Sequence, residues 1–174
     1  MSLFYTRSRF SLRLALNLLC LLAVLSGCAM PLAPAYDKAV SEALNAANTE
    51  AMTLFASLSL GVQKQDFPSR AEQYAQVIGK LDALAISANA RPVPKNAVTD
   101  KVNAVLDKTL PATVESSDTR LPSVVAIRKI AETVIKMRDT DIKQGLTAYE
   151  VIAFKQQASI YFDQAITYEN FLQR

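Results

Sequence analysis

The reactive side chains available to this 174-residue chain are carboxylates, hydroxyls, lysines and two cysteines, because histidine is absent. Without histidine the chain cannot form a Ser-His-Asp or Cys-His catalytic arrangement, and it lacks the usual zinc and copper ligand sets. Neither a Gly-x-Ser-x-Gly nor a Ser-x-x-Lys pattern, the local signatures of a serine nucleophile, occurs in the sequence. We therefore expect a protein that is not an enzyme and that uses no cofactor.

The acidic segment that contains Asp139 and Asp141, followed by Glu150, has part of the spacing of a calcium-binding helix-loop-helix. Lys143 stands where that loop needs an oxygen ligand, and Gly145 comes one position later than the glycine on which the loop turns. A simpler interpretation gives each of these residues an ordinary role in a helix-turn-helix segment. Lys143 lies in the last turn of a helix, Gly145 ends that helix, and the two aspartates lie on a solvated face. Glu150 is then the acid of a capping box at the start of the next helix, and we expect no metal site.

The first 27 residues have the organisation of a signal peptide. Arginines at positions 7, 9 and 13, with no acidic residue among them, precede a run over residues 14–25 that is apolar except for Asn17. As a helix this run would rise only ~18 Å, well short of the ~30 Å hydrocarbon core of a membrane. The run ends in the sequence Leu25-Ser26-Gly27-Cys28.

This ending resembles the lipobox of bacterial lipoproteins. The resemblance implies that the chain is cut between Gly27 and Cys28, and that Cys28 carries a diacylglyceryl group and an amine acylated with a fatty acid such as palmitate. Two or three acyl chains anchor a protein durably, because each buried methylene contributes ~0.8 kcal/mol. Ala29 replaces the aspartate that signals retention in the inner membrane, so the resemblance implies a lipid anchor in the outer membrane, facing the periplasm. The alternatives are an ordinary secretory signal with an incidental cysteine, or a short buried helix.

The expected processing changes what composition implies. Removal of residues 1–27 takes away three arginines and no acid, which leaves 16 basic and 16 acidic residues. A neutral domain lacks the excess of positive charge that nucleic-acid binding needs, so we expect no nucleic-acid partner. Cys20 leaves with the signal and Cys28 is acylated, so the mature domain is expected to fold without a disulfide.

Beyond a short lipidated tether at 28–34, residues 35–174 have the hydrophobic period of helices and form one expected domain. Long helices are expected over about 35–60, 69–90, 123–144 and 147–172, with a short helix over 96–110. Capping boxes are predicted at Ser69-Arg70-Ala71-Glu72 and at Thr147-Ala148-Tyr149-Glu150, and Gly61 is expected to cap the first helix. The fold class is therefore all-α: an up-and-down helical bundle of four long helices plus one short helix after a cleaved signal peptide.

Small residues recur along one face of each of the first two long helices. They are Ala39, Ala43, Ala47 and Ala51 on the first helix, and Ala75, Gly79 and Ala83 on the second. Either they allow the two helices to pack closely, or alanine is present as a good helix former. Close packing would offset the ~1 kcal/mol that Gly79 costs inside a helix relative to alanine.

The last helix has a broad apolar arc and is expected to be deeply packed. It carries Phe154, Tyr161 and Tyr168 at helical spacing. Aromatic residues at this spacing fit a core or an interface better than a ligand pocket.

Two functions fit this pattern. Beyond the lipobox, the chain is similar to the many small, uncharacterised helical lipoproteins of Gram-negative bacteria, and that similarity implies no activity. The first hypothesis is a non-catalytic interaction or scaffold module, held to the membrane through Cys28, that presents a helix face or the 111–122 loop to an envelope protein. It predicts an exposed apolar patch. The alternative is a carrier or sensor that binds a small hydrophobic ligand between its helices, which predicts a closed apolar cavity.

Overall fold

The computed structural model describes residues 33–94 and 121–173. These residues form α2 (Lys38–Ser57), the 3-10 helix η1 (Lys64–Ser69), α3 (Ala71–Asn89), α5 (Pro122–Gln144) and α6 (Ala148–Leu172). Within these ranges the chain contains no strand, which confirms the predicted all-α class. The predicted signal peptide, most of the predicted tether and the short helix over 96–110 lie outside the described residues. None of the described helices is both long and apolar enough to cross a membrane.

Each of three long helices begins at a residue that suits a helix start. The Asp37 carboxylate accepts hydrogen bonds from the backbone N–H groups of Ala39 and Val40, at 2.9 and 3.3 Å, and so caps α2. Pro122 opens α5, where its missing N–H costs no helical hydrogen bond. Thr147 and Glu150 form the predicted capping box at the start of α6, which confirms that prediction.

The capping box predicted at Ser69 and Glu72 is wrong. Ser69 is the last residue of η1, and its hydroxyl donates to the carbonyl oxygen of Asp66 at 2.7 Å. The N-cap of α3 is Arg70, whose side chain makes no capping hydrogen bond. Because the chain before α3 already forms a tight helical turn, the serine hydroxyl is satisfied within that turn.

The first helix also ends earlier than expected. Its last residue is Ser57 and its cap is Leu58, whereas Gly61 lies in the turn beyond the cap, with its N–H donating to the carbonyl oxygen of Leu58 at 2.8 Å. Gly61 has a φ of 83°, the left-handed region that favours glycine.

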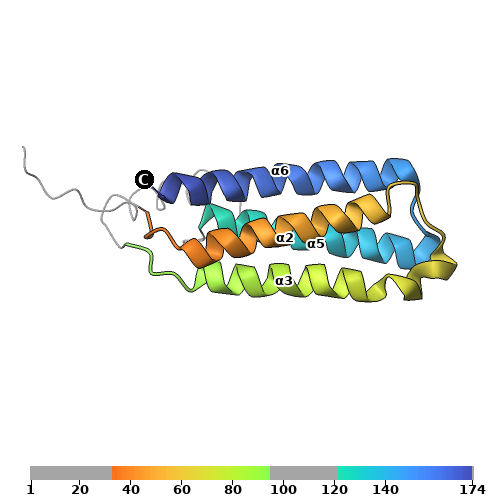
Figure 1. The fold of residues 1–174 in the computed structure, drawn as a ribbon, viewed down its shortest axis with the longest axis horizontal. Coiled ribbons are helices and arrows are strands. Elements are labelled where there is room, and N and C mark those ends of the chain that lie inside the picture. The colour runs from red at the N-terminus through yellow and green to blue at the C-terminus, as the bar shows by residue number, and fades with distance from the viewer. Residues whose placement is uncertain (1–32, 95–120, 174) are drawn as a thin grey trace, which may run out of the picture. The chain divides into compact units, whose positions relative to one another are not determined.

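The four long helices pack around one apolar core. α2 packs against α3 and α6, and α5 packs against the same two helices. Figure 1 shows the four helices lying lengthwise beside one another. Residues 58–70, which include η1, join α2 to α3, and residues 145–147 join α5 to α6. The ribbon in Figure 1 runs in opposite directions through the two helices of each pair. Leu44, Leu81, Ile127 and Phe162, one from each helix, are among the core side chains that are almost completely buried.

The small residues of the second long helix are not a packing surface. Ala75, Gly79 and Ala83 are all exposed on α3, although Ala47 and Ala51 are buried on α2. A Cβ atom added at Gly79 would meet no neighbouring atom within 4 Å. The interpretation that close helix packing offsets the cost of Gly79 is therefore wrong.

Replacing Gly79 with alanine should stabilise the protein by up to ~1 kcal/mol. Alanine has the higher helix propensity, and it restricts the unfolded chain without meeting any neighbour in the folded one. In a domain of this size the change should raise the midpoint of thermal unfolding by ~2–4 °C, which far-UV circular dichroism can measure. A lower midpoint would instead show that something covers this face of α3.

Candidate functional site

The outer face of α6 is the candidate functional site, because half of the large hydrophobic side chains that are exposed in the described residues lie on this helix. They are Tyr149, Ile152, Ile160 and Phe171, with exposed fractions of 86%, 48%, 54% and 57%. The expectation that the last helix is deeply packed is therefore wrong for this face. The buried residues of α6 lie on the opposite side, toward α5 and α2.

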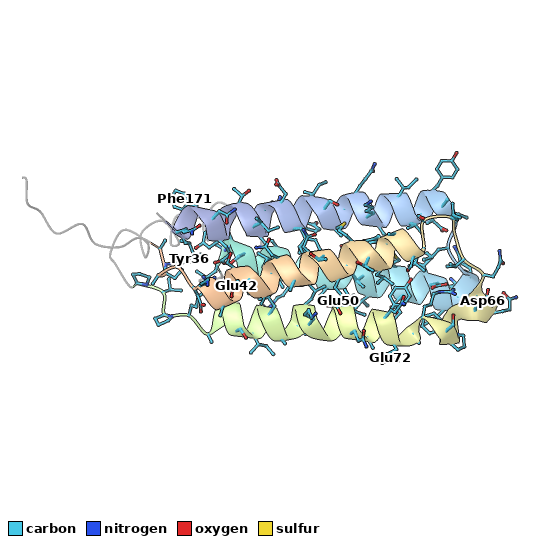
Figure 2. The ribbon with its side chains drawn as sticks, in the orientation of Figure 1. Tyr36, Glu42, Glu50, Asp66, Glu72 and Phe171 are labelled. Carbon is cyan, nitrogen blue, oxygen red and sulfur yellow. The ribbon has the colours of Figure 1, made fainter. Side chains whose placement is uncertain are left out.

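One row of exposed residues runs along the whole length of this face, and we call it the outer stripe. It consists of Tyr149, Ala153, Gln156, Ile160, Gln164, Thr167 and Phe171. Successive members are three or four residues apart, so they share one side of the helix. None of them carries a charge, which is unusual for a solvated helix face. Figure 2 places Phe171 in the last turn of α6, and Asp66 at the opposite end of the helices.

The beginning of α6 is held by two turns that lie side by side, paired through one antiparallel bridge. Val62 and Leu146 exchange both backbone hydrogen bonds, at 2.8 and 2.9 Å, in an isolated bridge between the connection after α2 and the connection after α5. Gly61 and Gly145 flank this bridge, each with a φ of 83°. The bridge ties the start of α6 to the end of α2.

The capping box sets the direction of the first turn of α6. The Glu150 carboxylate accepts from the backbone N–H of Thr147 at 2.8 Å, and the Thr147 hydroxyl oxygen accepts from the N–H of Glu150 at 3.2 Å. The hydrogen bond from the Thr147 backbone is the main reason that the pKa of Glu150 lies below its ordinary value. The ionised form of Glu150 therefore stabilises this helix start.

The far end of α6 is held by a buried ion pair. Arg91 donates to both carboxylate oxygens of Glu169, at 2.6 and 2.8 Å, and it also bonds the carbonyl oxygen of Ala88 and the hydroxyl of Ser123. The Glu169 side chain is 1% exposed and the Arg91 side chain 7% exposed. One guanidinium thus joins the ends of α3 and α6 to the start of α5.

A second buried ion pair lies at the other end of α3, where that helix begins. Arg70 donates to both carboxylate oxygens of Asp141, at 2.5 and 2.6 Å, and to the carbonyl oxygen of Gln63 at 2.8 Å. The Tyr74 hydroxyl donates to the same carboxylate at 3.2 Å. The hydrogen bond with Asp141 is the main cause that raises the pKa of Arg70. The interpretation that placed Asp141 on a solvated face is wrong, because this side chain is completely buried.

The acids of the segment that resembled a calcium loop do not converge. Asp139 is exposed and accepts from its neighbour Arg138, whereas Asp141 points into the core toward Arg70. Lys143 lies in the last turn of α5 and Gly145 is its cap, as predicted. Among the described residues, no three or more His, Cys, Asp or Glu side chains lie close enough to hold a metal ion.

Tyr74 gives the Arg70–Asp141 pair a testable pH dependence. Burial and the nearby Asp141 carboxylate raise the pKa of Tyr74 well above its ordinary value of 10, so the folded protein favours the neutral phenol. The stability that this preference provides is complete below pH 10 and is lost as the pH rises above it toward the folded pKa. Tyr74→Phe should therefore lose less stability than the unaltered protein between neutral pH and pH above 10.

Urea unfolding at a series of pH values measures this difference. Tyr149→Phe is the matched control, because it removes the same hydroxyl from a side chain that is 86% exposed. Equal alkaline destabilisation of Tyr74→Phe and the unaltered protein would contradict the burial of the Tyr74 hydroxyl.

The aromatic residues predicted on the last helix are half-buried. Phe154, Tyr161 and Tyr168 pack against the core from its edge, and burial is the main cause that raises the pKa of Tyr168.

Phe154 and Tyr161 also line a surface groove of about 230 Å³ between α5 and α6, whose other walls include Lys129, Glu132 and Lys136. A second groove of about 190 Å³ lies between α2 and α3. Ligand pockets usually enclose ~300–1,000 Å³, so both grooves are small.

The sequence did not identify Arg70, Arg91 or Glu169 as residues that hold the helices together. One signal was present: Glu169 follows Phe162 and Ala165 at the spacing of the buried face of α6. Both buried carboxylates accept bidentate hydrogen bonds from a guanidinium, an arrangement that suits a structural role better than proton transfer.

Comparisons with protein-family models, curated proteins and solved structures find no match for this chain.

Proposed function

We propose that this protein is a lipid-anchored lipoprotein of the bacterial outer membrane that acts as a non-catalytic interaction or scaffold module. The sequence Leu25-Ser26-Gly27-Cys28 supports the anchor, and Ala29 supports the outer membrane as its location. The outer stripe of α6 supports the interaction role. It is the single observation that carries the function, because an uncharged row of exposed side chains along a whole helix is typical of a surface that another protein covers.

We also propose that the domain is an up-and-down bundle. Arg70, just before α3, contacts Asp141 in the last turn of α5, and Arg91, just after α3, contacts Ser123 at the start of α5. α3 and α5 therefore run in opposite directions, as do the two helices of the α2–α3 and α5–α6 pairs in Figure 1. A rigid bundle of this kind would hold the outer stripe straight.

The carrier hypothesis has weaker support. Its best evidence is the groove that Phe154 and Tyr161 line between α5 and α6. Charged side chains from α5 form part of its wall, and a closed apolar cavity is what a hydrophobic ligand requires. An exposed stripe has no role in such a carrier, so we favour the interaction module.

The anchor can be tested by replacing each cysteine of the full chain in turn. Cys28→Ala should abolish incorporation of labelled palmitate and should leave the protein uncut and detached from outer-membrane fractions. Cys20→Ala is the matched control, because Cys20 would leave with the signal peptide and its loss should change nothing. Palmitate incorporation that persists in Cys28→Ala would overturn the proposed anchor.

The interaction role can be tested at the centre of the stripe. Ile160→Lys places a charge on the outer face of α6 and should abolish cross-linking of the membrane-bound protein to its partner. Ile86→Lys is the control, because Ile86 is 71% exposed on α3 and lies outside the stripe. Equal cross-linking in both variants would contradict an interface on α6.

A further inference from the structure

The outer stripe of α6 is symmetric about Ile160. In each direction from Ile160, the next members of the stripe come four, seven and eleven residues away. The symmetric positions also carry similar side chains: Gln156 matches Gln164, Ala153 matches Thr167, and Tyr149 matches Phe171. The order along the stripe is therefore aromatic, small, amide, isoleucine, amide, small, aromatic.

The spacing makes the stripe nearly straight. Tyr149, Ile160 and Phe171 are separated by eleven residues each, which is three helical turns at 3.67 residues per turn. A row with this period drifts little around an α-helix, so a second straight helix can follow it from end to end. Its length from Tyr149 to Phe171 is ~33 Å at 1.5 Å per residue.

We propose that the partner of this face is a second copy of the same chain, with the two α6 helices antiparallel and a two-fold axis passing beside Ile160. The proposal rests on the interaction role proposed above and names its partner. In this arrangement Ile160 meets Ile160 of the other copy, each Gln156 meets a Gln164, and each Tyr149 meets a Phe171. Two-fold axes require such self-complementary surfaces. Paired amides can exchange hydrogen bonds, and paired aromatic rings gain from edge or offset packing.

The charges beside the stripe also favour the antiparallel arrangement. The charged residues nearest to the stripe are Asp163 and Glu150. In the antiparallel pair Asp163 lies opposite Gln157, and Glu150 lies opposite Asn170, so no like charges meet. In a parallel pair the two copies of Asp163 would lie at the same level, where they would repel each other. Antiparallel helices also align their macrodipoles favourably.

Cysteine cross-linking in the full, membrane-bound chain tests this geometry. Ile160→Cys should form a disulfide-linked dimer under mild oxidation, because a residue beside the two-fold axis meets its own copy. Tyr149→Cys alone should not, since the two copies of residue 149 would lie ~33 Å apart and a disulfide needs Cα atoms within ~7 Å. The double variant Tyr149→Cys/Phe171→Cys should form the dimer. Ile86→Cys on α3 is the exposed control and should stay monomeric.

The outcomes separate this proposal from the interaction role. A monomeric Ile160→Cys protein would overturn the antiparallel pair, and so would a Tyr149→Cys protein that cross-links as readily as Ile160→Cys. If Ile160→Cys stays monomeric while Ile160→Lys still loses a cross-linked partner of different mass, the pairing of copies fails and the interaction role stands. If Ile160→Lys also loses no partner, both proposals fail.

Discussion

Replacing Asp141 with alanine should lower the free energy of unfolding by ~3–5 kcal/mol, because the change leaves the Arg70 guanidinium buried without its counter-charge. The Arg70 side chain is only 7% exposed, so bulk water has little access to the N–H groups that the carboxylate would leave without an acceptor. The Tyr74 hydroxyl loses its acceptor in the same change. Since most domains are stable by only ~5–15 kcal/mol, a loss of this size should be evident in urea unfolding.

Two further variants show whether burial causes this loss. Asp139→Ala removes the same chemical group from the exposed Arg138–Asp139 pair on the same helix, and it should cost no more than ~1 kcal/mol. Arg70→Met combined with Asp141→Leu removes both charges and should recover most of the stability lost in Asp141→Ala. Equal losses in Asp139→Ala and Asp141→Ala would contradict a buried ion pair at Asp141.

The sequence predicted the helices well because each one has a clear apolar face. The period of the apolar residues, with Pro122 and the Thr147–Glu150 box at helix starts, located α5 and α6 to within a residue or two. The wrong predictions concerned helix ends, where the hydrogen bonds of single side chains decide the structure and the apolar period does not. At Ser69 the serine pattern of a capping box was present, yet a preceding 3-10 turn used the hydroxyl instead.

The buried ion pairs could have been suspected from the same periodicity. Asp141 follows Ile130, Val134 and Met137 at intervals of three and four, which places it on the buried side of α5. Its partner Arg70 lies 71 residues away, and no local pattern relates the two. A sequence can therefore show that a carboxylate falls on a buried face, but the identity of its partner depends on how the helices pack.

The outer stripe could not be predicted from the sequence for a related reason. The apolar residues of α6 cover a broad arc, and from sequence alone that breadth predicted deep packing. Only the neighbours of α6 determine which part of the arc is covered: α5 and α2 bury the side with Val151, Ala158 and Phe162. Tyr149 and Ile160 remain on the opposite side, so the candidate interface follows from the packing.

Replacing Gly145 with alanine should destabilise the protein by at least ~1–3 kcal/mol and should loosen the start of α6. Gly145 has a φ of 83° and a ψ of −173°, a backbone conformation that is essentially restricted to glycine. The added Cβ would also overlap the carbonyl oxygen of Val62, which accepts a hydrogen bond from Leu146 in the bridge between the two turns. Neither strain can be relieved without breaking that bridge. Urea unfolding measures the loss, and amide hydrogen exchange at Leu146 should be faster in the variant.

Glycine-to-alanine substitutions at two other positions show whether the strained backbone and the overlapping Cβ cause this destabilisation. Gly61→Ala should behave like Gly145→Ala, because Gly61 has the same φ and its Cβ would come within 2.8 Å of the carbonyl oxygen of Leu146. Gly79→Ala should have the opposite sign, since Gly79 lies in a regular helix with open space around it. If all three variants are as stable as the unaltered protein or more stable, the paired turns do not require glycine at positions 61 and 145. If only Gly61→Ala and Gly145→Ala destabilise the protein, the paired turns hold the start of α6 in place. Cross-linking at the Tyr149 end of the outer stripe should then weaken in those two variants, because the first turn of α6 frays.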